Sequence, residues 1–491
     1  MEKENEDKKY LYGASVQGIQ GFIFQTNKLK EIVGASELVE QICTTEYGGL
    51  FNEFGEKGES VVRAAGNIKH IFNNREDCEK AVLNFPKKVM TVAPGITISQ
   101  AVVALKADLS DYAEKANELE NRLRIQRNKP VRSMTLGLTA IHRAPSTGLP
   151  AVEEHGEDGM IDEASKKKIE QHQATRKLAE KSFRKPLSQK EIAYDLEDIV
   201  NKVDKNNWIA VIHADGNGMG AIFREVGKDK VEMKRFSERV SSITEAAAQK
   251  AFQFVEAKYE WAKIIPIRPV VLGGDDLTLI CRADLAVDYT KIFLEAFEKE
   301  AKKETKNQSG KNLTACAGIA FVKSSYPFHY AVALAESLCK RAKGKAKTIN
   351  KDLPPSCLMF HKVQDSFVED FEKIIERELT PQKDLSFEFG PYYCGEHENG
   401  KGATIKKLLE DVDLLKKNNA IKSHLRQWLS ALFDNVGAAD QMMKRLKTIH
   451  EKETSFIEDK FLNLSIRTEK VEIPFYDILS LVSILFTETK K

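Results

Sequence analysis

The chain has 491 residues, and 75 Lys and Arg against 73 Asp and Glu give it a formal net charge of +2. That length is too great for one hydrophobic core and predicts about three domains. The near-neutral charge does not indicate a globally basic nucleic-acid-binding protein, and a local basic patch stays open as an alternative. Seven scattered cysteines without a C-x-x-C pair imply no zinc site or disulfide framework and fit a reducing cytoplasm. Residues 1–9 are too charged for a signal peptide and no apolar run is long enough for a membrane helix, so we expect a cytoplasmic protein with no membrane partner.

The first part of the chain contains three apolar strand candidates separated by helical stretches. They lie near residues 12–16, 62–67 and 95–103, and a glycine-containing turn follows the first. With a fourth strand between the second and third, this order is the ferredoxin-like βαββαβ pattern. We therefore predict a ferredoxin-like domain over residues 1–152.

A charged segment, residues 153–205, is predicted to join this domain to the next. Residues 153–163 are acidic and contain glycine, as a loop does, and residues 164–185 are polar nearly all round. Such a helix is solvated or part of a mobile linker. The run Lys166-Lys167-Lys168 is expected on a solvated face, and contact with RNA is the less favoured alternative.

The same strand and helix order returns over residues 206–352, where it carries acidic turns. The apolar run 208–212 leads into Asp215 and a glycine-rich turn, and a second apolar run is interrupted by Gly273-Gly274-Asp275-Asp276. A tight turn between two strands would bring the last two carboxylates to its tip, and a third would lie at the end of the strand from 208. We predict a second ferredoxin-like domain with an acidic site.

The two domains align as an internal repeat. Gly21 can be set against Gly220, an offset of 199 residues, and Asn67 against Asp276, an offset of 209. In this alignment the three acidic positions are Val16, Gly66 and Asn67 in the first copy. The first domain is therefore predicted to be a catalytically degenerate copy.

Residues 353–491 change in character, and most of them are predicted to be helical. Apolar residues recur at helical spacing over 365–379, 403–417, 420–433 and 475–486. Residues 382–402 are expected to form a long loop. Its segment 389–393 would either stack on a base or pack against the helices. The predicted fold class is thus α+β, with two ferredoxin-like domains followed by an α-helical C-terminal domain.

Three clustered carboxylates, Asp215, Asp275 and Asp276, suit one or two divalent cations such as Mg²⁺ or Mn²⁺, which prefer oxygen ligands. They are the predicted catalytic and metal-binding residues, since such ions activate a ribose hydroxyl and steady a triphosphate. The neighbouring turn residues are the predicted nucleotide contacts, because bare backbone N–H groups at a helix start attract phosphate. The alternative for the glycines is turn geometry or close packing. The predicted contacts are Gly216, Asn217, Gly218, Gly273 and Gly274.

These motifs resemble the large polymerase-palm subunit of type III CRISPR effector complexes. The first palm of that family is matched by residues 18–24 and 32–36, and the second by residues 215–220 and by the GGDD turn at 273–276. Residues 334–336, leading into 342–345, resemble a helix that ends in a phosphate-contacting lysine, here Lys343.

The resemblance implies two palm domains, a helical C-terminal domain and synthesis of a cyclic oligonucleotide from ATP. It also implies RNA or other effector subunits as partners. Family members commonly begin with a histidine–aspartate nuclease domain and carry a cysteine zinc site after the first palm, and neither is found in this sequence. We therefore expect a compact or stand-alone variant, and a homo-oligomer remains open.

Further alternatives stay open on sequence grounds, two for the function and one each for Lys343 and His213. A scaffold subunit that binds RNA would keep GGDD only as a remnant, and a nuclease would use the same metal site without a nucleoside triphosphate. Lys343 would otherwise be a solvated lysine in a basic run. His213 lies two residues before Asp215, on the same face of a strand, and is expected to be packed rather than to touch substrate.

Overall fold

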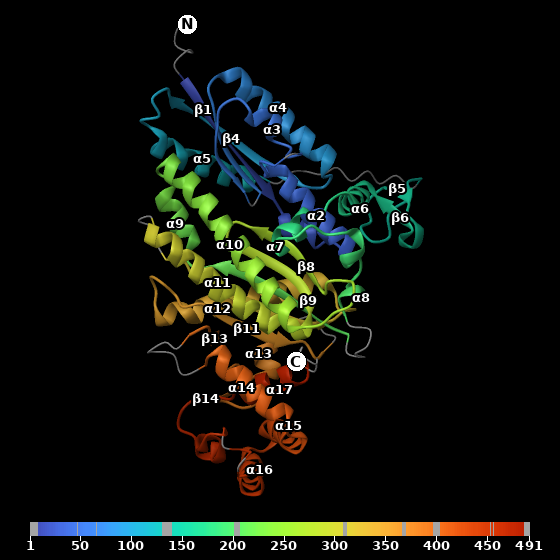
Figure 1. Ribbon diagram of the computed structural model, residues 1–491, viewed down its shortest axis with the longest axis vertical. Coiled ribbons are helices and arrows are strands. Elements are labelled where there is room, and N and C mark those ends of the chain that lie inside the picture. Colours follow the sequence, from blue (N-terminus) through green and yellow to red (C-terminus); the bar gives the residue numbers. More distant parts are fainter. Residues whose placement is uncertain are drawn as a thin grey trace.

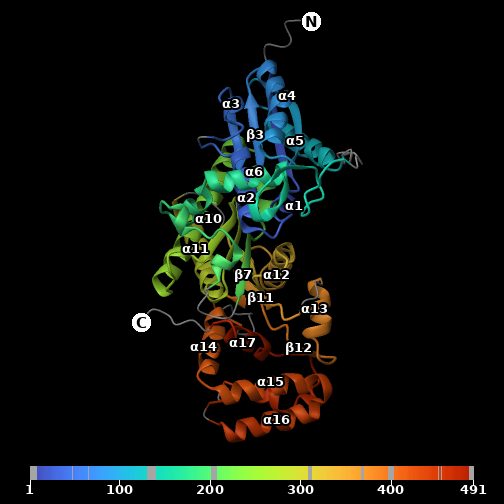
Figure 2. The ribbon, with the colours of Figure 1, turned by 90° about the vertical axis from the view of Figure 1, so that its right-hand side faces the viewer.

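The computed structural model describes residues 8–46, 48–64, 66–129, 140–200, 207–307, 312–365, 370–395, 403–451, 453–454 and 456–485. The molecule is elongated, with the N-terminal sheet at one end, a second sheet in the middle and a group of helices at the other end (Figure 1). Figure 2 shows the same three-part order from the side. No helix among the described residues has the length and apolar character of a membrane span.

The first palm is a four-stranded antiparallel sheet in the order β2-β3-β1-β4. This is the strand order of a ferredoxin-like βαββαβ domain. Helix α5 packs on β1 and β4, and Gly13 on β1 allows this because a Cβ there would lie 2.9 Å from Leu119 on α5. The elements are β1 Lys8–Gln17, α1 Ile19–Ile23, α2 Leu29–Cys43, α3 Asn52–Gly55, β2 Glu59–Ala64, β3 Asn67–Phe72, α4 Arg75–Val92, β4 Thr97–Lys106 and α5 Tyr112–Arg127.

The second palm repeats this arrangement within a six-stranded sheet, ordered β13-β11-β10-β7-β9-β8. Its strands are buried in continuous runs and therefore on both faces, and α12 covers β10 and β7. Strand β11 runs parallel to β10, so the sheet continues past residue 352. The elements are β7 Trp208–Gly216, α9 Met219–Val226, α10 Lys230–Lys258, β8 Ile267–Gly273, β9 Asp276–Arg282, α11 Ala286–Asn307, β10 Ala315–Lys323, α12 Phe328–Ile349 and β11 Cys357–Lys362.

The C-terminal region is mainly helical, as predicted, and its core is built around Trp428, which is fully buried. The segment 389–393 packs instead of standing free, because Tyr392 and Tyr393 form β13 and pair with β11. Residues 366–369 and 396–402 of the predicted helices and loop lie outside the described residues. The elements are α13 Phe371–Glu378, β12 Leu385–Ser386, β13 Tyr392–Tyr393, α14 Ile405–Lys416, α15 Asn419–Asp434, α16 Val436–Ile449, β14 Val471–Glu472 and α17 Phe475–Val482. The predicted α+β class, with two ferredoxin-like palms and a helical C-terminal region, is confirmed.

The structure corrects the alignment of the two copies by one residue. Gly18 and Gly218 both precede a helix with positive φ, 63° and 70°, which is an offset of 200 rather than 199. Ser15 on β1 lies opposite Asn67 on β3, and its hydroxyl donates to the Asn67 side-chain oxygen at 2.9 Å. Ser15, Gly66 and Asn67 therefore stand where Asp215, Asp275 and Asp276 stand in the second copy, and Val16 does not. No carboxylate takes these three positions, so the first copy lacks the trio as predicted.

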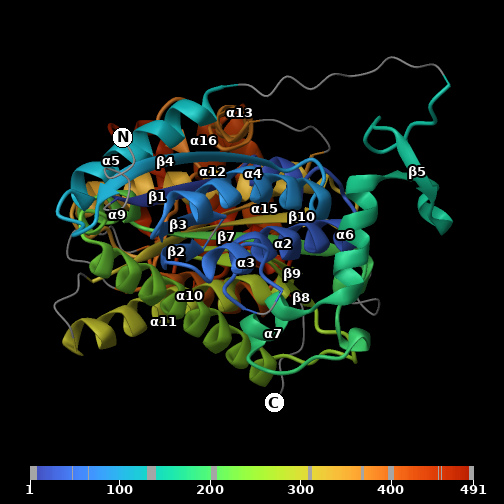
Figure 3. The same ribbon diagram turned by 90° about the horizontal axis from the view of Figure 1, so that it is seen from above.

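The segment between the palms packs against α2. The prediction that it is a solvated helix or a mobile linker is therefore wrong. It contains β5 Ala151–Glu154, β6 Met160–Asp162, α6 Glu163–Ala174, α7 Lys177–Phe183 and α8 Leu196–Ile199, and Figure 3 shows α6 beside α2. Lys168, expected on a solvated face, is 1% exposed and donates to the Phe22 carbonyl at 2.8 Å. Burial lowers the pKa of this Lys168 ammonium to about 8. A helix that is polar on all sides can bury a charged side chain only where another element supplies a hydrogen-bond partner. The periodicity of its own sequence does not reveal such a partner.

Gly34 on α2 gives a direct test of the contact with α6. A Cβ at Gly34 would lie 1.7 Å from the carbonyl oxygen of Lys168, which is backbone and cannot rotate away. We expect Gly34→Ala to push α6 off α2 and to lower the free energy of unfolding by about 1–3 kcal/mol. Thermal unfolding of the purified protein measures this.

The matched control is Gly344→Ala on α12, where a Cβ meets nothing within 4 Å. Since alanine is favoured over glycine inside a helix, this variant should be as stable as the parent or slightly more so. Equal melting temperatures for the two variants would contradict the close α2–α6 contact.

Candidate functional site

The acidic residues of the second palm meet at one end of its sheet. Strand β7 delivers His213 and Asp215, and the two-residue turn between β8 and β9 carries Asp275, with Asp276 opening β9. Ligand atoms of His213, Asp215 and Asp276 lie within 4.8 Å of one another. The end of β7 and the β8–β9 turn, which the sequence predicts to lie together, do so in the structure.

Glycines allow the hairpin tip to approach β7 closely. A Cβ on Gly216 would come within 3.0 Å of the Asp275 side chain, so Asp275 lies directly over the end of β7. Gly274 has φ of 61°, a conformation that the turn requires and that glycine adopts without strain. The hydroxyl of Thr244 on α10 lies 2.7 Å from the Gly274 carbonyl and fixes the tip from behind.

Crowding of the carboxylates disfavours their simultaneous ionisation. Burial, together with the charge of Asp215, raises the pKa of Asp275 to about 7. Burial and the charges of Asp275 and Asp215 raise the pKa of Asp276 to about 8. A positive charge placed among them would reverse both shifts, because opposite charge favours the ionised form.

Lys343 supplies one such charge. It projects from α12 and donates to the Asp215 carboxylate and, at 2.8 Å, to the Gly216 carbonyl. Its side chain is 17% exposed and that of Asp215 is 33% exposed, so the pair lies at a partly open surface. The predicted phosphate lysine is thus found at the acidic site and not in a solvated basic run.

The other predicted contacts differ in their surroundings. Gly218 directly precedes α9, and a Cβ at this position would have no other atom within 4 Å, so its backbone is approachable. Gly273 lines a cavity, described below. The Asn217 side chain is buried and donates to the Thr314 hydroxyl at 3.0 Å, and its nucleotide contact remains a prediction.

His213 belongs to the same cluster although it was expected to be packed. Its Nδ1 lies 3.0 Å from the Thr278 hydroxyl on β9, and burial lowers the pKa of the imidazole. A neutral imidazole with one nitrogen held by a partner is the form that binds a metal ion. His213 is therefore both packed and available as a ligand.

A cavity of about 460 Å³ lies between the two palms and reaches the acidic cluster. The second palm contributes His213, Gly273 and Asp276, and the first contributes residues 18–21, 23 and 24. Apolar side chains of both palms form most of the remaining wall. The cavity has the size and lining of a small-molecule site.

Helix α12, which carries Lys343, is held by the first palm at two places. Gln20 donates to the Glu336 carboxylate, and the Asn27 side-chain oxygen accepts from the Phe328 N–H at 2.8 Å. Asn27 thereby caps the first turn of α12, whose own preceding residue, Pro327, makes no side-chain cap. Neither contact has a local sequence pattern, because each joins residues about 300 positions apart.

The comparisons with known proteins agree with the fold. Residues 208–352 match the family described as Cas10/Cmr2, second palm domain. The second palm belongs to the Cas10/Cmr2 family. No curated protein sequence matches the chain.

Solved structures support the same fold. Csm1 of T. onnurineus superposes with a TM-score of 0.54 at 13% identity over 97% of the present chain and 70% of that one. A Csm1–Csm4 cassette in complex with cA4 gives a TM-score of 0.52 at 12% identity, over 99% of the present chain and 70% of that one. A cassette in complex with one ATP gives a TM-score of 0.52 at 13% identity, over 98% of the present chain and 70% of that one. In a further Csm1–Csm4 cassette, in complex with AMPPNP, the present chain covers 54% of the length of the matched chain.

Removing one charge from the carboxylate cluster should stabilise the metal-free protein. Asp276→Asn keeps the shape but removes a carboxyl group whose ionised form burial and the neighbouring Asp275 and Asp215 disfavour, and Lys343 retains its partner Asp215. We expect its melting temperature in chelator to rise by about 2 °C or more, and the increase that Mn²⁺ causes in the parent to disappear. Differential scanning fluorimetry with and without Mn²⁺ measures both.

Asp352→Asn, at an exposed position beyond α12, is the matched control and should behave like the parent in both conditions. A variant Asp276→Asn that is destabilised in chelator yet still responds fully to Mn²⁺ would contradict a cation-binding role for Asp276.

The cap on α12 can be tested separately. Asn27→Ala removes the acceptor for the Phe328 N–H and should lower the free energy of unfolding by about 1 kcal/mol, whereas Asn27→Asp keeps an acceptor and should restore it. Urea denaturation of the three proteins compares them. If Asp and Ala have the same effect, Asn27 does not act as a cap.

Proposed function

We propose that this Cas10-like chain is a metal-dependent nucleotidyltransferase that converts ATP into a cyclic nucleotide or oligonucleotide, a second messenger in antiviral defence. The observation that carries the proposal is the convergence of Asp215, Asp275 and Asp276 beside a cavity between the palms, with Lys343 on the same cluster. A scaffold has no use for three partly buried carboxylates placed together, which cost stability unless a cation joins them.

The donor set fits a divalent cation. Carboxylates of Asp215 and Asp276, with Asp275 next to them, are the oxygen ligands that Mg²⁺ and Mn²⁺ prefer, and Mn²⁺ also accepts an imidazole such as that of His213. A bound ion of this kind would lower the pKa of a ribose hydroxyl and neutralise a triphosphate. We infer one or two ions with Asp215, Asp275 and Asp276 as their ligands.

The remaining residues have roles in binding and orientation. Lys343 would leave Asp215 when a cation arrives and would then contact the phosphates of ATP. The backbone near Gly216 and Gly218, with Asn217 between them, would face the phosphates, and Gly273 and Gly274 would let the nucleotide approach the hairpin. Catalysis then depends on positioning and charge neutralisation, without a separate protein base.

ATP as the substrate is supported by the cassettes solved with one ATP and with cA4. The same structures contain Csm4, so a subunit of that kind is the proposed partner in an effector complex with RNA. The alternative is a non-catalytic RNA-binding scaffold of such a complex. It differs from the proposal in one measurable respect, since a scaffold forms no product from ATP.

The test is incubation of the purified protein with each nucleoside triphosphate and Mg²⁺ or Mn²⁺, with and without RNA, followed by mass spectrometry. We expect a cyclic product from ATP, and an activity at least about 100-fold lower in Asp275→Ala/Asp276→Ala because electrostatic stabilisation of the phosphoryl group disappears. Lys343→Ala should reduce the rate while leaving cation binding intact.

Asp352→Ala is the matched acidic control and should keep full activity. Product formation that is unchanged in Asp275→Ala/Asp276→Ala would reject the proposal. Absence of product under all conditions, with RNA still bound, would favour the scaffold.

A further inference from the structure

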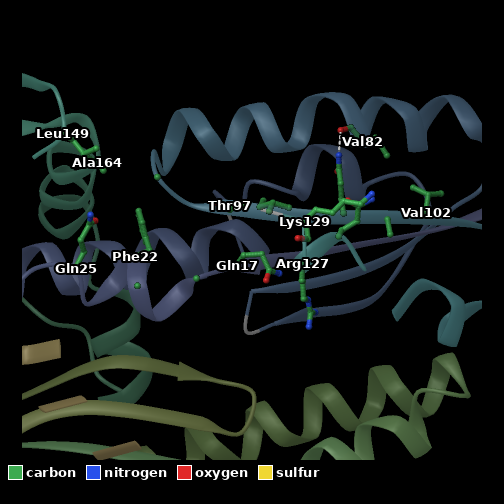
Figure 4. Close-up of a pocket in the computed structure, with 18 residues that line it drawn as sticks. Gln17, Phe22, Gln25, Val82, Thr97, Val102, Arg127, Lys129, Leu149 and Ala164 are labelled. Carbon is green, nitrogen blue, oxygen red and sulfur yellow. Dashed lines mark hydrogen bonds between the residues drawn. The ribbon is translucent and has the colours of Figure 1, made fainter. Parts of the chain in front are cut away.

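A second and larger hollow lies on the first palm, away from the acidic cluster. Its volume is about 1030 Å³, more than twice that of the cavity between the palms. Figure 4 shows it beside β4, with Arg127 and Lys129 near that strand and Phe22 and Gln25 towards α6. We call it the β4 groove.

The β4 groove has a positive lining. Of its described lining residues, Arg127 and Lys129 at the end of α5 are the only charged ones, and none is acidic. Both are exposed, and Arg127 uses one guanidinium nitrogen on the Ser15 hydroxyl at 3.2 Å. In a chain with nearly equal numbers of acidic and basic residues, a hollow of this size without a carboxylate favours an anionic ligand.

Uncharged hydrogen-bonding groups complete the lining. Gln17 donates to the Ser15 carbonyl, which leaves its side-chain oxygen for a ligand, and Gln25 accepts from Lys168, which leaves its NH₂ group. Thr97 adds a hydroxyl. Such donors and acceptors next to cations suit a ligand that carries both phosphates and base edges.

The shape of the groove suits a strand. Six consecutive β4 residues, 97–102, line it, which corresponds to about 17 Å of extended chain. That is the length of about five stacked nucleotides at a rise of about 3.4 Å each.

Strand β4 is the edge of its sheet, so an added peptide strand is the competing occupant. Arg122 disfavours it, because its guanidinium donates to the Val102 carbonyl at 2.6 Å and interrupts the row of free backbone groups. An extended peptide would also have to be acidic along its length to match Arg127 and Lys129.

We propose that the β4 groove binds a single strand of nucleic acid, with phosphates at Arg127 and Lys129 and base edges at Gln17, Gln25 and Thr97. This binding does not depend on nucleotidyl transfer, and it can be measured in a protein without activity.

The groove is joined to the candidate active site by α1. Gly18 and Gly21 line both the β4 groove and the cavity between the palms, so α1 is their common wall. The same element carries Gln20, which contacts Glu336 on the helix of Lys343. A strand in the groove therefore lies against the element that holds α12.

The experiment measures fluorescence anisotropy of a labelled RNA of about ten nucleotides with the full chain. The groove variant is Arg127→Glu/Lys129→Glu. Its matched control is Lys87→Glu/Arg124→Glu, which makes the same charge change at exposed first-palm positions outside the groove lining. All four side chains are exposed, so folding should be retained, and circular dichroism checks it.

We expect the groove variant to bind at least about tenfold more weakly, while the control binds like the parent. Its salt dependence should fall by about 1.4 in log–log slope, since each of two phosphates that is no longer neutralised accounts for about 0.7. A DNA strand of the same sequence should compete, and millimolar ATP or polyglutamate should not.

Three results would each overturn the proposal. Equal weakening of RNA binding in the groove variant and in the control would show that the β4 groove is not the binding surface. Full competition by ATP would favour a mononucleotide as the occupant, and full competition by polyglutamate would favour an acidic protein.

Discussion

The second palm is organised around the placement of three carboxylates in a partly buried position. The end of β7 and the β8–β9 turn can approach this closely because Gly216 has no side chain and Gly274 takes a positive φ. Burial, followed by the resulting repulsion, raises the pKa of Asp275 and Asp276, and Lys343 on α12 partly offsets the repulsion. Helix α12 is positioned in turn by Asn27 and Gln20 of the first palm. The acidic cluster therefore connects both palms.

The two palms show how one fold carries two electrostatic outcomes. Where the second copy has an acidic contact between β7 and β9, the first has a neutral hydrogen bond from Ser15 to Asn67. Neutral groups need no cation, so the first copy retains the sheet and the turn without the repulsion. What it contributes instead are side chains such as Gln20 and Asn27, which reach across to the helix of the other copy.

Local patterns were sufficient for the strand order, the repeat and the grouping of Asp215, Asp275 and Asp276, because each depends on periodicity or on a turn of a few residues. Three features could not be obtained in this way. The offset between the copies was one residue wrong, since glycines at 18, 21, 218 and 220 permit two alignments and only the positive φ of Gly18 and Gly218 decides. Lys168 was expected to be solvated, because its partner Phe22 is remote in sequence. The α12 contacts depend on the packing of whole domains, which no window of sequence contains.

The continuation of the catalytic sheet into β11 and β13 has a mechanical consequence. Backbone hydrogen bonds tie β10 to β11 and β11 to β13, so the second palm and the start of the C-terminal region share one sheet. The first palm meets them through side-chain contacts such as those of Gln20 and Asn27, and through Ser36, which donates to the Val270 carbonyl. Separating a few side-chain contacts costs less free energy than breaking a row of backbone hydrogen bonds within a sheet. The second palm and the start of the C-terminal region are thus one backbone-paired body, and the first palm joins that body through side chains, with the cavity between the palms lying along this junction.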